Sequence, residues 1–191
     1  DFSDCATHTI ADGDLSYEGF DILVSCATLE IEGDHTFRSL SVEGASGGTV
    51  TSHTSHVTLT ASMTVEAGAV IDASGKGYAS ASGLGAGTSH SVSGGGGGHG
   101  GDGGHSSQGV PGGGGYGDAT APTTLGSGGG NAASSASTPG GAGGGAIWIT
   151  APSLVLEGEL RAEGAPGVIA SAGRASGGGA GGSVFLEVDS L

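Results

Sequence analysis

The sequence predicts an all-β protein, a short-stranded β-solenoid similar to a parallel β-helix, which carries an ordered glycine-rich insertion. Three observations lead to this prediction. Short runs of residues alternate between apolar and polar, which is the period of a half-buried strand. A strand–turn–strand unit occurs twice, and glycine supplies 45 of the 191 residues. We interpret the chain as a single domain in three parts, residues 1–75, 76–145 and 146–191.

Residues 1–75 are expected to form an acidic region of β-strands. The runs 21–33, 37–44 and 56–75 alternate and are rich in Val, Ile, Leu and Thr, with Gly, Asp and Ser between them. Residues of the first group favour strands, whereas those of the second favour turns. Apolar positions of these runs, and of the strands after residue 145, form the expected core: Leu29, Ile31, Leu40, Val42, Leu59, Val65, Ile71, Ile147, Ile149, Leu154, Leu156, Leu160, Phe185 and Val188.

Residues 76–145 are expected to be packed and ordered, unlike a flexible linker. Ordering glycine costs more backbone entropy than ordering any other residue, and this tract has few side chains to bury. Hydrogen bonds between polyproline-II-like segments can compensate, because that helix has three residues per turn and no internal hydrogen bonds. We therefore expect an extended threefold segment over residues 94–105. The residues with expected structural roles are Gly98, Gly100, Gly101, Gly103 and Gly104, together with Tyr116 and Trp148 as anchors of the glycine tract to the core.

Residues 146–191 are expected to return to β-strands, interrupted by a shorter glycine-rich stretch at 173–182. The segments 63–75 and 154–164 share one plan, in which a strand, a turn at glycine and a second strand are followed by Ala-x-Gly. Repeated units of this kind are typical of stacked solenoid coils. An immunoglobulin-like β-sandwich is the alternative, since it also consists of short alternating strands.

Composition indicates an extracellular protein. Asp and Glu outnumber Lys and Arg by 19 to 4, and the formal net charge of −15 disfavours a nucleic-acid partner, which needs a basic surface. Cys5 and Cys26 are the only cysteines, and we expect them to form a disulfide. No apolar run approaches the roughly 20 residues of a membrane span. We expect Asp1 to begin a mature or excerpted segment.

Three residues of the glycine tract are candidate metal ligands. His99, Asp102 and His105 are spaced by three, and the surrounding GGHGGDGGH partly matches a calcium-binding nonapeptide. On a threefold helix their Cα atoms would lie about 9 Å apart, too far for one ion. We therefore expect no metal and no cofactor, with calcium as the remaining option. Asp12-Gly13-Asp14 and Glu32-Gly33-Asp34 could hold a surface calcium, but Asp-Gly and Gly-Asp pairs are ordinary turn formers, and we interpret both motifs as turns.

No catalytic residues are expected. Polysaccharide-cleaving sites need charged groups that converge on one face, whereas the four basic residues are scattered along the chain. No phosphate-binding loop occurs, since Lys76 is followed by Gly77. His53 and His56 precede a strand, and we expect them in an exposed turn.

The stretch from Gly75 to Thr150 resembles the glycine-rich modules of very large secreted and cell-surface proteins of bacteria and protists. The motifs HGGDGG, YGD and PTTLGSGGG occur in the order found in that family, and the resemblance covers roughly residues 56–167. It implies strand pairs that alternate with polyglycine-II-like tracts. It also implies an extracellular structural or adhesive role without enzyme activity.

The sequence thus predicts a building block of a cell-surface fibre, appendage or adhesin. We expect its partners to be copies of itself or neighbouring modules of a longer chain. Self-association is expected through β-edges, such as the apolar SVFLEV run at residues 183–188, and through glycine-rich packing. The alternative is a carbohydrate- or ligand-binding adhesin module that recognises cell-surface glycans.

Overall fold

The computed structural model is all-β, as the sequence predicts. Its regular elements, among the residues that the structure describes, are strands and one short 3₁₀ helix, Leu15–Tyr17. The structure describes residues 1–44, 48–52, 54–132, 138–170 and 173–191.

The chain divides into two compact units. The first, called here the strand unit, comprises residues 1–72, 147–161 and 184–191. The second, called the glycine unit, comprises residues 73–146 and 162–183. Residues 162–183, which include the glycine-rich stretch at 173–182, belong to this second unit.

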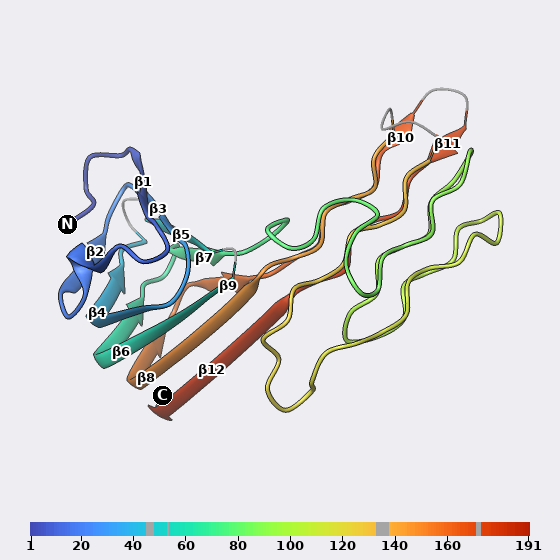
Figure 1. Ribbon diagram of the computed structural model, residues 1–191. Coiled ribbons are helices and arrows are strands. Elements are labelled where there is room, and N and C mark those ends of the chain that lie inside the picture. Colours follow the sequence, from blue (N-terminus) through green and yellow to red (C-terminus); the bar gives the residue numbers. More distant parts are fainter. Residues whose placement is uncertain (45–47, 53, 133–137, 171–172) are drawn as a thin grey trace. The chain divides into compact units, whose positions relative to one another are not determined.

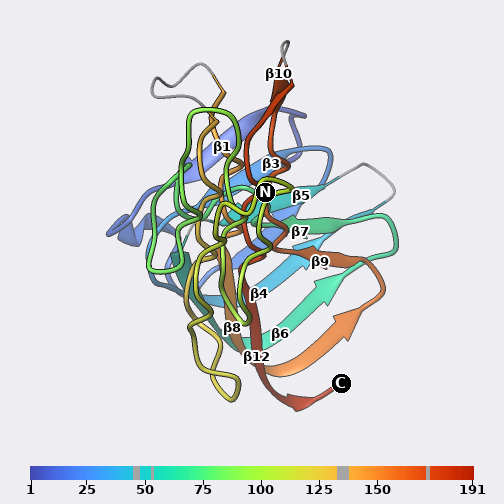
Figure 2. The ribbon, with the colours of Figure 1, turned by 90° about the vertical axis from the view of Figure 1, so that its right-hand side faces the viewer.

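The strand unit contains two five-stranded sheets, and successive strands alternate between them (Figure 1). Figure 2 shows the odd sheet, β1-β3-β5-β7-β9, with its strands in this order. The even sheet has the order β2-β4-β6-β8-β12. The odd strands are β1 (Thr7–Ile10), β3 (Thr28–Ile31), β5 (Thr49–Ser52), β7 (Val70–Asp72) and β9 (Glu159–Arg161). The even strands are β2 (Asp21–Val24), β4 (His35–Val42), β6 (Thr54–Val65), β8 (Ala146–Leu156) and β12 (Ser183–Ser190).

Parallel pairing stacks equivalent residues into columns. In the odd sheet, Leu29 lies opposite Val50, Val50 opposite Ile71, and Ile71 opposite Leu160. Parallel strands with covered inner faces carry Val, Ile and Leu at successive equivalent positions, which is why the alternating runs of the sequence resemble one another. The parallel registers differ from the antiparallel pairing of the immunoglobulin-like alternative.

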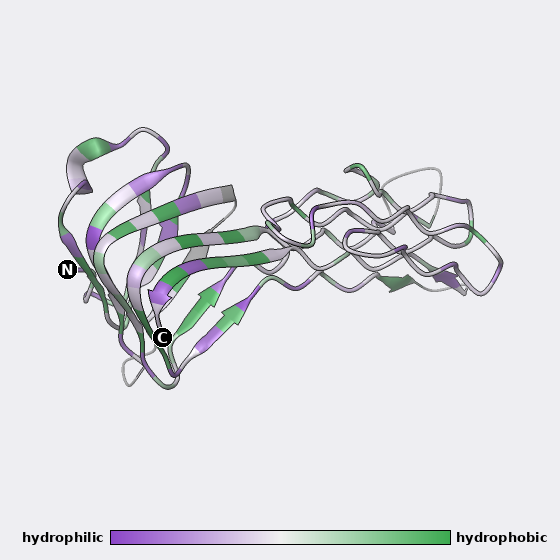
Figure 3. Ribbon diagram, turned by 90° about the horizontal axis from the view of Figure 1, so that it is seen from below, coloured by the Kyte–Doolittle hydropathy of each residue, from purple (hydrophilic) through white to green (hydrophobic). Residues whose placement is uncertain are grey.

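The core lies between the two sheets, and ten of the fourteen positions that the sequence assigned to it are buried. Alternating hydrophobic and hydrophilic bands along the strands are visible in Figure 3. The buried predictions are Leu29, Ile31, Leu40, Val42, Leu59, Val65, Ile71, Ile147, Ile149 and Leu154. Leu156 was wrongly assigned to the core, because its side chain is 39 % exposed. Leu160, Phe185 and Val188 are half-buried, since β9 and β12 are the last strands of their sheets.

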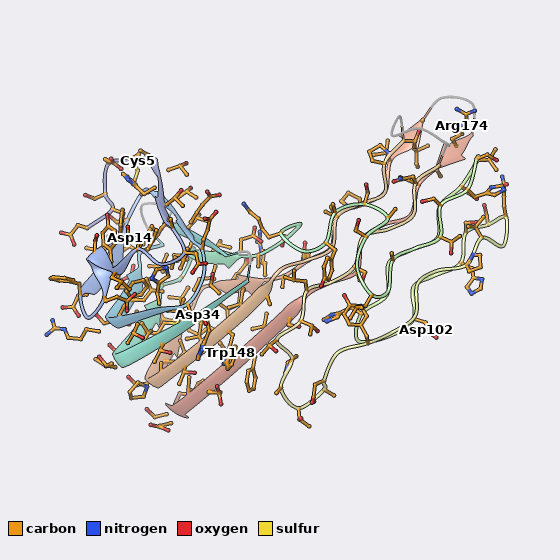
Figure 4. All side chains as sticks on the ribbon, viewed as in Figure 1. Cys5, Asp14, Asp34, Asp102, Trp148 and Arg174 are labelled. Carbon is orange, nitrogen blue, oxygen red and sulfur yellow. A yellow bond between two sulfur atoms is a disulfide. The ribbon has the colours of Figure 1, made fainter. Side chains whose placement is uncertain are left out.

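The glycine unit consists mainly of extended segments outside any helix or sheet ladder. A small sheet in this unit pairs β10 (Ile169–Ala170) with β11 (Arg174–Ala175) in antiparallel fashion. Figure 4 shows that side chains crowd the strand unit, whereas the segments of the glycine unit carry few. This unit must therefore be held largely by its backbone.

Candidate functional site

The hydrogen bonds of the glycine unit repeat every three residues. In segment 126–131, the amides of Gly126 and Gly129 both donate to segment 140–145, at 2.8 and 2.9 Å. The amides on either side of Gly129 have other partners. The amide of Gly128 donates to the carbonyl of Ser82 at 2.9 Å, and the amide of Gly130 donates to the carbonyl of Gly95 at 2.8 Å. Three successive amides thus reach three different neighbouring segments.

Segment 94–98, the first half of the predicted threefold stretch, follows the same rule. The amides of Gly94 and Gly97 donate to one neighbour, the carbonyls of Ala175 and Gly178, and those of Gly95 and Gly98 donate to another, the carbonyls of Thr88 and Gly85. The four distances lie between 2.7 and 2.9 Å. Each segment is therefore surrounded by backbone partners on several sides, as a period of three residues per turn requires.

Glycine is needed where these segments touch. A Cβ added to Gly95 would lie 2.5 Å from the carbonyl carbon of Pro111 and 2.9 Å from the amide nitrogen of Gly112. A Cβ on Gly129 would meet the backbone of Gly177, and one on Gly113 would meet the carbonyl of Gly85. Because all of these neighbours are backbone atoms, no flexible side chain can move aside.

Residues 94–105 form two segments, and the expectation of one continuous helix is wrong. The amide of His99 donates to the carbonyl of Gly101 at 3.1 Å, and that of Gly96 donates to Gly104 at 2.9 Å. The chain therefore turns after His99 and returns beside itself. Of the predicted structural glycines, Gly98 and Gly103 are closely packed against backbone, whereas Gly100, Gly101 and Gly104 have open space where a Cβ would point.

Tyr116 anchors segments within the glycine unit. Its hydroxyl donates to the carbonyl of Leu125 and lies 2.8 Å from Ser127 Oγ, and its ring stands edge-on to that of His99 at 4.9 Å. Burial raises the pKa of Tyr116. The sequence expected Tyr116 to bind the glycine tract to the strand core. The contacts found for Tyr116 are instead with residues of its own unit.

The candidate metal ligands have separate roles. Asp102 accepts a hydrogen bond from the amide of Gly115 at 2.7 Å, and His99 Nε2 lies 2.8 Å from Thr124 Oγ1. Within the described part of the chain, the structure brings no three His, Cys, Asp or Glu side chains together as a metal-binding group, so His99, Asp102 and His105 do not form one. The first two residues therefore stabilise turns of the glycine unit.

Trp148 belongs to an aromatic row in the strand unit that the sequence did not reveal. Its ring stacks on His56 with centroids 3.8 Å apart and lies 5.9 Å from Phe185. Its Nε1 donates to Glu187 at 2.9 Å, and His56 Nε2 lies 2.9 Å from the hydroxyl of Thr150. The three rings project from β6, β8 and β12, which are adjacent in the even sheet.

His56 was expected in an exposed turn, but it lies within strand β6. His53 lies outside the described residues. From the sequence, alternation within each strand could predict that these aromatic side chains point outward. It could not predict that they form a row, because that depends on the register between strands. Both Trp148 and its partners thus stabilise the even sheet.

Several aspartates stabilise turns or surface ion pairs. The hydrogen bonds of Arg38 and Ser39 lower the pKa of Asp21 to about 2. The Ser16 hydroxyl lowers the pKa of Asp14, which caps the 3₁₀ helix. The Thr120 hydroxyl lowers the pKa of Asp118 in the same way. These carboxylates are held by local partners.

The predicted disulfide between Cys5 and Cys26 is confirmed. It joins the N-terminal segment to the turn between β2 and β3. Among the described residues, no helix has the length and apolar character needed to cross a membrane.

Comparison with known proteins gives no relative. No family model, curated protein or solved structure matches the chain.

Proposed function

We propose that the chain is a non-enzymatic structural module of an extracellular fibre, appendage or adhesin. The observation that carries this proposal is the three-residue repeat of backbone hydrogen bonds in the glycine unit. An interior filled by backbone presents few chemical groups to a substrate, but it ties many segments together laterally. Such an arrangement suits a mechanical role.

The strand unit supports a β-solenoid. Neighbouring strands of its two sheets pair in parallel, as β1 does with β3 and β2 with β4, and the chain passes to the other sheet between them. Equivalent residues consequently stack in columns, as in coils that repeat along an axis. The repeat shared by residues 63–75 and 154–164 corresponds to the two adjacent odd strands β7 and β9.

The glycine unit supports a bundle of polyproline-II-like segments. That helix has three residues per turn and leaves every amide available to a neighbour. Amides three residues apart, such as those of Gly126 and Gly129, do bond to one neighbour. Glycine is required because a Cβ at each contact would separate the backbones, as at the axis of collagen.

An extracellular location is supported by the disulfide, because such bonds persist in oxidising compartments. The resemblance of the glycine tract to modules of large surface proteins points the same way. The lowered pKa values of Asp14, Asp21 and Asp118 have local structural causes, so these groups are better explained as turn and ion-pair residues than as catalytic acids.

The glycan-binding alternative would use an open aromatic platform. The face of Trp148 is instead stacked on His56, and its indole N–H is bonded to Glu187. These contacts favour the structural proposal.

Immunogold labelling of the source cells tests the proposal. Antibodies against the folded chain should label filaments or the outer surface in negatively stained, unpermeabilised cells. Antibodies first absorbed with the purified chain should label nothing. Labelling that appears only after permeabilisation would overturn the proposal.

A further inference from the structure

The even sheet ends at an unprotected edge strand. In the described part of the sheet, β8 is the one neighbour of β12. Strand β12 runs from Ser183 to Ser190 and contains no proline. The Ser183 amide donates to Gly145, next to the start of β8, at 3.0 Å. Because backbone groups alternate in direction along a strand, those of residues 184, 186 and 188 point to the outer edge.

The side chains of the same three residues are apolar and incompletely covered. Phe185 and Glu187 contact Trp148 on the outer face of the sheet, so alternation directs Val184, Leu186 and Val188 toward the core side. Val184 is nevertheless 38 % exposed, and Leu186 and Val188 are only half-buried. An apolar edge with unpaired amides is suited to pairing with another strand.

The opposite end of the even sheet is already occupied. Phe2 forms a parallel bridge with Val24, beyond β2, and its side chain is only 7 % exposed. Its ring packs against those of His8 and Tyr17, at 5.1 and 5.7 Å. A second copy therefore cannot add its β12 to this end without displacing the first residues of the chain.

The sequence of β12 is complementary to itself. An antiparallel pair centred on Leu186 places Leu186 opposite Leu186, and Val184 opposite Val188. In this register, the outward-pointing backbone groups of residues 184, 186 and 188 form the hydrogen bonds between the two strands. On the other face it places Phe185 opposite Glu187, so no like charges are directly opposite. Centring on residue 187 would instead oppose two glutamates, which destabilises a strand pair.

We propose that β12 pairs antiparallel with β12 of a second copy across a twofold axis at Leu186. The choice of a second copy as the partner rests on the structural role proposed above. The pairing joins the even sheets of two copies at their open edges. Because the contact uses the same surface twice, it closes as a dimer and does not propagate into a filament.

Charge gives the dimer a defined salt dependence. Each copy carries a formal charge of −15, so two copies repel at long range. Salt screens that repulsion, with a Debye length of about 8 Å at physiological ionic strength. The dimer should therefore become tighter between low and moderate salt, whereas an association driven by ion pairs would weaken.

Cysteine crosslinking tests the register directly. Both native cysteines are joined to each other, so an introduced thiol is the only reactive one. Leu186→Cys should give a covalent dimer on oxidation, because directly opposite Cα atoms lie about 5.5 Å apart. Val188→Cys is the matched control on the same strand and face. Its two copies would lie four residues apart, about 14 Å, and should not crosslink.

Sedimentation velocity over a concentration series tests the surface. The wild-type chain should be a dimer, and Leu186→Lys should raise its dissociation constant at least about tenfold. Leu15→Lys is the control, since Leu15 is 74 % exposed and lies outside β12; it should remain dimeric. Far-UV circular dichroism checks that each variant is folded. If Leu186→Lys does not fold, the crosslinking of Leu186→Cys alone tests the pairing of β12.

Four outcomes would overturn the pairing. These are a wild-type monomer at the highest attainable concentration, equal crosslinking of Val188→Cys, a dimer unaffected by Leu186→Lys, and an open-ended polymer. A monomer would indicate that another strand, such as a following segment of a longer chain, covers β12. None of these outcomes moves the immunogold label from the cell surface, so failure of the pairing is distinguishable from failure of the proposed function.

Discussion

Replacing Gly95 by alanine should destabilise the glycine unit. Gly95 donates its amide to Thr88 and accepts from the amide of Gly130, at 2.9 and 2.8 Å. The added Cβ would lie 2.5 Å from the carbonyl carbon of Pro111, about 1 Å short of the 3.5–4.0 Å at which carbon atoms pack. Segment 94–98 or segment 110–115 must therefore move.

The size of the effect follows from what the movement disrupts. Overpacking a well-packed interior costs about 1–3 kcal/mol. A displacement of about 1 Å also weakens the two hydrogen bonds of Gly95, each with a net worth of about 1 kcal/mol. Alanine stiffens the unfolded chain, which returns about 0.4–1 kcal/mol. We expect a net loss of about 3 kcal/mol.

Gly100→Ala is the matched control in the same tract. A Cβ there meets nothing within 4 Å, so only the stiffening of the unfolded chain applies, and stability should rise by about 0.4–1 kcal/mol. Urea denaturation measures both variants, and hydrogen exchange of the Gly130 amide reports the local change. Equal effects of Gly95→Ala and Gly100→Ala would refute the close-packed bundle.

Three further predictions concern the strand unit. Reducing the Cys5–Cys26 bond should lower the free energy of unfolding by about 3 kcal/mol, because it reopens a loop with a sequence separation of 21; an unchanged urea midpoint in reductant would contradict this. Asp21 has a lowered folded-state pKa of about 2, so its contribution is present above the unfolded pKa of about 3.9 and is lost as pH falls toward 2. Asp21→Asn should therefore flatten the fall of Tm between pH 4 and 2, roughly that window, and identical pH profiles would exclude the linkage. Phe37→Ala should cost about 3–5 kcal/mol in denaturant unfolding because Phe37 is fully buried, whereas Leu156→Ala should change stability by less than about 0.5 kcal/mol.

Much of the strand unit was predictable because its signals are local. Alternation identified buried positions such as Leu29 and Ile71, and parallel stacking then placed them in one column. The prediction for Leu156 failed because burial in β8 does not keep a strict period of two: Ala151 and Leu154 are buried, whereas Val155 and Leu156 are exposed at the end of the strand. Phe2 is buried by its bridge to Val24, a contact between distant residues that no short window contains.

The glycine tract was predictable in kind but not in path. Its composition pointed to backbone hydrogen bonds between segments, yet a run of glycine residues does not specify where the chain turns. The turn after His99 separates the packed Gly98 from the open Gly100. The row formed by His56 and Trp148 was missed for a related reason, since the register of β6 against β8 aligns the two rings and the sequence alone does not fix that register.

The route of the chain helps to explain how so much glycine can be ordered. The tract leaves the strand unit after β7 and returns at β8, and a second excursion runs from β9 to β12. The strands at the two ends of each excursion belong to the sheets of the strand unit, and holding these ends lowers the entropy cost of closing the excursion. The second excursion supplies Gly178 to Gly97 and Gly177 to Gly141 as backbone acceptors. The absence of side chains at these contacts allows segments of the two excursions to approach within backbone hydrogen-bond distance.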